Sequence, residues 1–257
     1  MEERAAEWLA ARRRAGMALA DWPAALKPAT EAAGYEVQAR TMTLLQPLWG
    51  APAGWKIGVT TKAMQDYLGI SAPIAGRMPA LFRRAPGVEV HHAAYCRIGI
   101  ETEIALVLKT ALAGPVSAEE AARAVGQVHP AIELVDDRYG GDYSGVGVPA
   151  IIADFAFHAG FVLGGPVAGW ETIDLGAVRG TTRVNGKIVG EGFGRDVMGH
   201  PFRSLAWLAG RLAEMGQRLE PGEVVMTGSL PLPYWAKAGD RIQSEIERLG
   251  TVTLEFV

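Results

Sequence analysis

The stretch RIGIETEIALVLK, residues 97 to 109, places two glutamates one residue apart in an otherwise apolar run. Side chains alternate between the faces of a strand, so Glu101 and Glu103 share one face, with about 6.6 Å between their Cα atoms. Ala105 and Val107 continue that face, and aliphatic residues fill the other. This pattern predicts a strand that is apolar on both sides. Two carboxylates directed into such a place need a counter-charge.

A third acid has the same character. Glu133 lies in HPAIELVDD, between apolar residues. Three carboxylates that converge in a pocket of low dielectric repel one another, at a cost on the order of several kcal/mol, unless a cation neutralises them. Without that cation, each carboxylate also raises the pKa of the others. An all-oxygen ligand set without an HExxH motif favours Mg²⁺ or Mn²⁺ over zinc, and it leaves coordination positions for water and a chelating substrate. The alternative is an edge strand with one solvated face, which the ExE spacing alone does not exclude.

Lys56 is the next candidate. In GWKIG, Trp55 and Ile57 occupy one face of a strand, and Lys56 lies on the other face between two glycines. Small neighbours allow a ligand to approach the backbone closely. Lys56 is therefore a candidate partner for a substrate carboxylate, although an exposed strand lysine fits the composition equally well.

Two histidines are candidates with simpler structural alternatives. Asp154 and His158 are four residues apart in IADFAFHAG and would share a face if this segment were helical. A histidine among phenylalanines is otherwise a core residue. His200 precedes a helix that has Pro201 in its first turn, so it either caps that helix or faces the pocket.

Composition excludes several classes of function. The formal net charge is −3, the pI is about 6.0, and ARRRAG near the N-terminus is the longest basic run, so neither a nucleic-acid groove nor a membrane patch is predicted. The N-terminal segment lacks the pattern of a secretory signal, and no apolar run reaches 18 residues. Cys96, the single cysteine, excludes an intrachain disulfide and is expected to be buried. We expect a cytoplasmic protein that acts on a small molecule.

The order of the predicted elements indicates an α+β fold. Helical patterns at residues 2–20 and 31–49 suggest an N-terminal helical layer, residues 1–53. Short β-like runs dominate residues 54–257. Helices interrupt them at residues 117–129, where Ser117 as N-cap and Glu120 three residues later predict a capping box, and from residue 200 to Gly216. Asn-Gly at 185–186 predicts a hairpin turn. The many short strands and 32 glycines favour a curved sheet or barrel in one domain, residues 54–257.

Familiar catalytic motifs are missing. GEGFG at residues 190–194 follows a hairpin strand instead of opening a βαβ helix, which argues against a dinucleotide site. No serine lies in a G-x-S-x-G elbow, and the chain has no P-loop.

Several ordered motifs from about residue 50 to the end resemble one known family. GWKIGVTTKAMQDYLGI, IETEIALVL, PAIELVDDR, the long run from NGKIVGEGFGRDVMGHPF to EVVMTGSL, and AGDRIQSEIERLGTV are similar to the 2-oxopent-4-enoate hydratase and 2-oxo-3-hexenedioate decarboxylase family, within the fumarylacetoacetate hydrolase superfamily. The resemblance implies a mixed β-roll core, a Mg²⁺ or Mn²⁺ site at Glu101, Glu103 and Glu133, and a substrate-binding and catalytic role for Lys56. It also implies a homo-oligomer that handles a small 2-oxo acid in aromatic catabolism.

The chain departs from the family pattern at two positions. Members usually carry an acid where GRMPALFRR has Leu81, and an amide residue where ADFAFHAG has Phe155. Phe155, as a substrate-binding residue, and Phe157 would make the pocket narrower or more apolar. His158 is a candidate to replace the lost acid in proton transfer, and Asp136 is a further catalytic candidate.

The resulting hypothesis is a divalent-metal-dependent hydratase of a 2-hydroxypenta-2,4-dienoate-like substrate. The same metal site would also serve a 2-oxo-enedioate decarboxylase or an acylpyruvate C–C hydrolase. A dianionic substrate needs a second cation, for which Arg77, Arg83 and Arg138 are candidates, Arg138 being the preferred substrate-binding residue. An alternative of another class is a non-catalytic partner subunit with a vestigial pocket.

Overall fold

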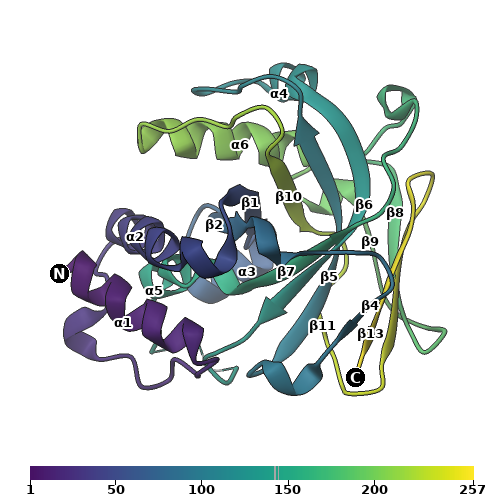
Figure 1. Ribbon diagram of the computed structural model, residues 1–257. Helices are drawn as coiled ribbons and strands as arrows, with labels where there is room; N and C mark the ends of the chain where they lie inside the picture. The colour runs from purple at the N-terminus through teal and green to yellow at the C-terminus, as the bar shows by residue number, and fades with distance from the viewer. Residues whose placement is uncertain (142, 144) are drawn as a thin grey trace.

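The computed structural model describes residues 1–141, 143 and 145–257, and its centre is a strongly curved, mixed β-sheet (Figure 1). The strand order is β2-β1-β10-β5-β6-β7-β3, with β11 paired to β5. Pairs β1–β10 and β3–β7 are parallel, and the other pairs in this sheet are antiparallel. The sheet contains β1 (Pro52–Gly58), β2 (Ile74–Pro79), β3 (Arg83–Arg84), β5 (Ile98–Leu108), β6 (Val125–Asp136), β7 (His158–Leu163), β10 (Val224–Ser229) and β11 (Tyr234–Trp235).

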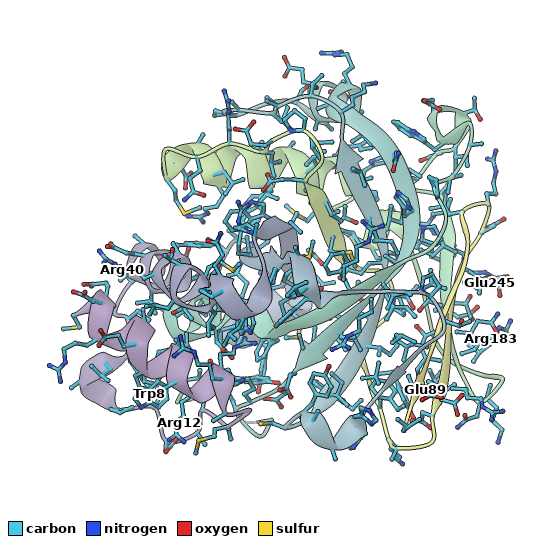
Figure 2. The ribbon with its side chains drawn as sticks, viewed as in Figure 1. Trp8, Arg12, Arg40, Glu89, Arg183 and Glu245 are labelled. Carbon is cyan, nitrogen blue, oxygen red and sulfur yellow. The ribbon has the colours of Figure 1, made fainter. Side chains whose placement is uncertain are left out.

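A second sheet of five strands packs against the first in the order β4-β13-β12-β8-β9. Its strands are β4 (Val88–Val90), β8 (Arg179–Val184), β9 (Lys187–Phe193), β12 (Arg241–Ile246) and β13 (Gly250–Phe256). Charged residues such as Glu89, Arg183 and Glu245 project from its outer side (Figure 2). The predicted hairpin turn is confirmed, since Asn185 and Gly186 join β8 to β9 with φ of 51° and 80°.

The interface between the sheets is apolar with one polar bridge. Aliphatic side chains of β5 and β6 pack against those of β12 and β13 in a single buried cluster. Between them, the Thr102 hydroxyl lies 2.7 Å from that of Thr182 and 2.6 Å from that of Ser244. Thr102 is the residue between the two glutamates of β5, so the bridge fixes the strand where it carries both carboxylates.

Helices cover the ends of the larger sheet. The N-terminal helices pack beside α5, and α4 and α6 lie together at another edge (Figure 1). Apolar residues of α1 and α2 share a buried cluster with α5 and Tyr139, so this predicted layer docks onto the strand-rich part. In the described part of the chain, no helix has both the length and the apolar character needed to span a membrane. The α-helices are α1 (Glu2–Arg14), α2 (Glu31–Trp49), α3 (Lys62–Leu68), α4 (Ala118–Ala124), α5 (Val148–Ala153) and α6 (Pro201–Glu214).

The structure confirms the predicted α+β class and curved sheet, with three local corrections. Residues 154–158 are not helical, because η4 (Phe155–Phe157) has positive φ throughout and His158 begins β7. Asp154 and His158 therefore do not pair. Cys96 is exposed instead of buried. The helix after Ser117 has the predicted capping box but ends at Ala124, where β6 begins.

We predict that Thr102→Val destabilises the protein by about 1–3 kcal/mol, because it leaves the buried Thr182 and Ser244 hydroxyls without their shared partner. Urea unfolding followed by circular dichroism measures this loss. Thr253→Val, on an exposed position of β13, is the matched control and should change stability by less than about 0.5 kcal/mol. Equal losses for the two variants would contradict a stabilising inter-sheet bridge.

Candidate metal centre and active site

Strand pairing brings the three predicted glutamates together. Glu101 of β5 lies directly opposite Glu133 of β6 in the antiparallel register, and Glu103 is two residues further along β5. One carboxylate oxygen from each residue lies within 4.8 Å of the other two. Like charges in such cross-strand positions repel. The arrangement therefore needs compensating positive charge.

A backbone N–H group binds the Glu103 carboxylate. Its side chain is fully buried, and its Oε2 accepts a hydrogen bond of 2.8 Å from Gly228 N–H. The register between β5 and β10 shifts just before Ser229, which exposes this N–H to the carboxylate. Gly228 has φ of 119°, and a Cβ there would approach Thr60 to 2.6 Å, so this position requires glycine.

Lys56 supplies one positive charge to the cluster. Its ammonium lies 3.4 Å from Glu133 Oε1 and donates a hydrogen bond of 2.9 Å to the carbonyl oxygen of Ala156. The side chain is 3% exposed. Burial opposes the charged form, but Glu133, Glu101 and Glu103 outweigh this effect and raise the lysine pKa. The structure confirms the predicted alternation of β1, because Trp55 and Ile57 belong to the core on the opposite face.

His158 lies behind Glu133 and outside the pocket. Its Nδ1 is 2.9 Å from Glu133 Oε1, and the ring is fully buried. Burial lowers its pKa more than the nearby carboxylate raises it, so the neutral ring donates from Nδ1 to Glu133. This contact fixes the orientation of the Glu133 carboxylate.

The three carboxyl groups differ in pKa. Burial, together with Glu133, raises the pKa of Glu101 to about 7, and Lys56 partly offsets this rise. Burial and the two neighbouring carboxylates raise the pKa of Glu103 well above its ordinary value. Burial also disfavours charge on Glu133, but Lys56 and His158 outweigh it and lower the pKa. Among the described residues, Lys56 is thus the one cation beside the three carboxylates, and it compensates one of them.

The residues present fit a hard divalent cation. Glu103 Oε1 and Glu133 Oε2 are buried and have no hydrogen-bond partner among the described residues. Such unpaired buried oxygens are costly, and they belong to the same cluster as Glu101. Carboxylate oxygens without nitrogen or sulfur ligands suit Mg²⁺ or Mn²⁺.

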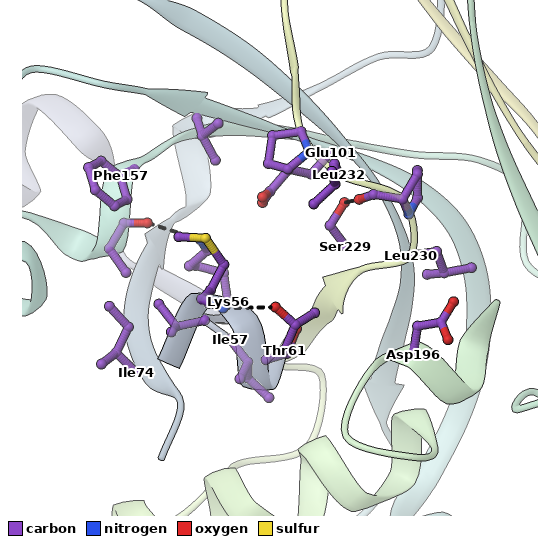
Figure 3. Close-up of a pocket in the computed structure, with 18 of the residues that line it drawn as sticks. Lys56, Ile57, Thr61, Ile74, Glu101, Phe157, Asp196, Ser229, Leu230 and Leu232 are labelled. Atoms are coloured by element: carbon purple, nitrogen blue, oxygen red, sulfur yellow. Dashed lines mark hydrogen bonds between the residues drawn. The ribbon is translucent and has the colours of Figure 1, made fainter. Parts of the chain in front are cut away.

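A pocket of about 320 Å³ opens beside these carboxylates. Figure 3 shows Glu101 and Lys56 at one side of it and Phe157 nearby. Glu103 and Glu133 are deeper and do not line the cavity. The walls are mainly apolar, and they include Val59, Met64, Ile74, Phe157, Leu232 and Trp235.

The structure locates Phe155, Asp136 and Arg138 away from this cavity. The Phe155 ring packs against Trp49, with ring centroids 5.4 Å apart, and Phe157 lines the pocket instead. Asp136 accepts a hydrogen bond from the backbone N–H of Arg97. The Arg138 guanidinium is buried, bonds to the Met17 carbonyl and lies 3.8 Å from Asp154. None of the three is in a position to touch a ligand in the pocket.

The other positions singled out in the sequence are also outside the cavity. Leu81, in η2 (Ala80–Phe82), is 67% exposed. Arg77 pairs with Glu223 at 2.7 Å, and Arg83 is exposed on β3. His200 caps α6, its Nδ1 accepting from Phe202 N–H. The sequence did not point to the wall formed by residues 229–233 and Trp235, for which the turn-forming run SLPLP after a buried strand was the available signal.

The backbone of residues 154–158 has an uncommon conformation where it approaches the carboxylate cluster. Phe155, Ala156 and Phe157 have φ of 60°, 48° and 68°, which costs about 1–2 kcal/mol for each such residue. Gly76 on β2 leaves room for this turn, because a Cβ there would lie 2.2 Å from the Phe155 carbonyl oxygen. The turn brings the Ala156 carbonyl to Lys56 and the Phe157 ring to the pocket.

Residues 76–257 match the protein-family model described as fumarylacetoacetate (FAA) hydrolase C-terminal. The chain belongs to this family. It is 34% identical over 225 residues to a 2-hydroxyhexa-2,4-dienoate hydratase of Comamonas testosteroni, covering 86% of this chain and 84% of the relative. It is also 33% identical over 205 residues to a 4-oxalocrotonate decarboxylase of Pseudomonas putida, covering 79% and 77% of the two chains.

A family member of known structure has the same fold. The 4-oxalocrotonate decarboxylase from Pseudomonas putida G7, complexed with magnesium and adipate, superposes with a TM-score of 0.93 at 28% identity. The alignment covers 100% of this chain and 97% of that one. The N-terminal helices of the present chain are therefore part of the shared architecture.

We predict that Glu103→Gln abolishes divalent-metal binding, because it removes one of three charges while its side-chain oxygen can still accept from Gly228. Calorimetric titration of metal-free protein with Mg²⁺ and Mn²⁺, with and without oxalate, measures this. The wild type should bind metal, and oxalate should tighten that binding. Saturating metal at 100 times its Kd should add about 2.7 kcal/mol of stability to the wild type only.

Glu245→Gln, on the exposed side of β12, is the control and should bind metal as the wild type does. Equal metal binding by wild type and Glu103→Gln would rule out this ligand set.

Proposed function

We propose that this chain is a divalent-metal-dependent hydratase of a 2-hydroxypenta-2,4-dienoate or a similar 2-oxo-4-enoate with one carboxylate. The observation that carries the proposal is the combination of a three-carboxylate cluster with a neighbouring pocket that is apolar and has one cation. Relatives that are hydratases and decarboxylases of this family support the general chemistry.

Glu101, Glu103 and Glu133 would hold Mg²⁺ or Mn²⁺, and Lys56 would bind the substrate carboxylate. When bound, the ion supplies Lewis-acid polarisation of the 2-oxo group and electrostatic stabilisation of negative charge. Lys56 remains an ammonium and orients the carboxylate end of the substrate. His158 keeps Glu133 ionised and fixed, as a positioning residue instead of a proton donor.

The charge of the pocket favours the hydratase over the alternatives. Among its described lining residues, Lys56 is the single cation, whereas Glu191 and Asp196 add negative charge to the wall. A second carboxylate at the distal end of a 2-oxo-enedioate would meet apolar or acidic groups there. Arg77, Arg83 and Arg138 do not line the cavity. The apolar wall suits an alkenyl chain without a terminal charge.

The reaction is tested by offering two substrates to the Mg²⁺-loaded protein. Loss of diene absorbance from 2-hydroxypenta-2,4-dienoate reports hydration, and CO₂ release from 2-oxo-3-hexenedioate reports decarboxylation. We expect kcat/KM for the monocarboxylate to exceed that for the dicarboxylate by at least about tenfold, a modest difference in terms of transition-state binding. A preference for the dicarboxylate with CO₂ release would identify a decarboxylase. Metal binding without turnover of either substrate would favour the non-catalytic alternative.

We predict that Lys56→Met lowers kcat/KM by at least about 30-fold, because truncating one member of a buried charge pair costs about 2–5 kcal/mol. The loss should appear mainly in KM if Lys56 binds the carboxylate in both the ground state and the transition state. Steady-state kinetics with saturating Mg²⁺ measures how the loss divides between kcat and KM. Lys62→Met, on exposed α3, is the matched control and should retain wild-type constants. Unchanged kinetics for Lys56→Met would remove this residue from the site.

A further inference from the structure

A buried side chain of the N-terminal helix α1 binds the turn at residues 154–158, which lies beside the pocket. Arg13 is in the last turn of α1, and its side chain is 5% exposed. Its guanidinium lies over the rings of Phe155 and Trp49, 5.2 and 5.7 Å from their centroids. A cation packed in this way against two aromatic rings has a fixed orientation.

The same guanidinium binds both ends of the left-handed turn. Its Nε donates to Asp154 Oδ1 at 2.5 Å, and Nη2 donates to the Asp154 carbonyl oxygen at 2.5 Å. Its Nη1 donates to the carbonyl oxygen of His158 at 3.1 Å. Arg13 therefore bridges the residue before the turn and the residue after it.

This turn needs an external restraint. Its three central residues are not glycines, yet all have positive φ, a conformation that persists only where surrounding contacts impose it. Two of the three contribute to the pocket: Ala156 accepts from Lys56, and Phe157 is part of the wall. A change in the turn would move the ammonium of Lys56 and the Phe157 ring together.

We propose that Arg13 is a positioning residue that holds the turn at residues 154–158 and thereby sets the position of Lys56 in the pocket. Arg13 itself does not touch the cavity. The planar guanidinium fork makes these three contacts at once, which a lysine ammonium at the end of a flexible chain cannot reproduce in the same geometry. The role assigned to Lys56 rests on the proposed function, but the restraint on the turn does not.

Two variants test the restraint in the full-length protein. Arg13→Met keeps an apolar stem against the aromatic rings and removes the fork, and Arg13→Lys keeps the charge without the fork. Arg14→Met, on an exposed position of the same helix, is the control. Hydrogen exchange by mass spectrometry should show amides of residues 154–159 exchanging at least about tenfold faster in Arg13→Met, with β5 and β6 unchanged. The exchange rates of these amides in Arg13→Lys should lie between those of Arg13→Met and those of the wild type.

Two further measurements report on Lys56. Reductive methylation of Lys56 should be faster in Arg13→Met than in wild type and Arg14→Met. The affinity of the Mn²⁺-loaded variant for oxalate should fall about tenfold, while its affinity for Mn²⁺ stays within about threefold of wild type. A structural role limited to anchoring α1 would alter the melting temperature without this selective loss.

The outcomes separate this inference from the proposed function. Unchanged exchange at residues 154–159 in both Arg13 variants overturns the restraint. Faster exchange with unchanged methylation of Lys56 overturns the link to the lysine. The wild type could bind no oxalate and turn over no substrate, while Arg13→Met still shows faster exchange at residues 154–159 and faster methylation of Lys56. In that case the proposed function fails and the positioning role of Arg13 stands. If Arg13→Met does not fold, the same criteria apply to Arg13→Lys.

Discussion

The architecture depends on holding three carboxylates close together at the middle of a sheet. Glu101 and Glu133 are direct cross-strand neighbours, and Glu103 is buried two residues away. A sheet with this register is stable only if positive charge and hydrogen-bond donors meet the carboxylates from outside the two strands. Lys56 from β1, Gly228 N–H from β10 and His158 from β7 approach from three other strands and meet part of this need, while Glu103 Oε1 and Glu133 Oε2 have no partner among the described residues.

The surrounding structure brings these donors into place by local departures from regular geometry. The register shift in β10 turns Gly228 N–H toward Glu103. The left-handed turn before β7 brings the Ala156 carbonyl to Lys56. Both departures occur beside the carboxylate cluster, which is consistent with the concentration of backbone strain at functional sites. The inter-sheet bridge at Thr102 fixes β5 at the residue between Glu101 and Glu103.

Membership of the fumarylacetoacetate hydrolase family and the cluster of three carboxylates agree on the general chemistry. The choice of a hydratase is our proposal, and it rests on the pocket lining. One lysine and an apolar wall suit one carboxylate and an uncharged tail. The hydration proposed here follows from that charge balance. Phe155, expected from the sequence to bind substrate, packs its ring on Trp49, and it is Phe157 that lines the pocket.

The sequence by itself determined the α+β class, the strand that carries Glu101 and Glu103, the alternation around Lys56 and the turn at Asn185-Gly186, because these features depend on periodicity and local backbone preference. It also singled out Glu133 as a buried charge. The tertiary structure alone decided which groups meet. Asp154 and His158 are close in sequence, yet one binds Arg13 from α1 and the other binds Glu133, because the positive φ values between them reverse their directions. Asp136 and Arg138 fall outside the pocket for a related reason: side-chain direction at the end of a strand depends on long-range packing, which no local pattern specifies.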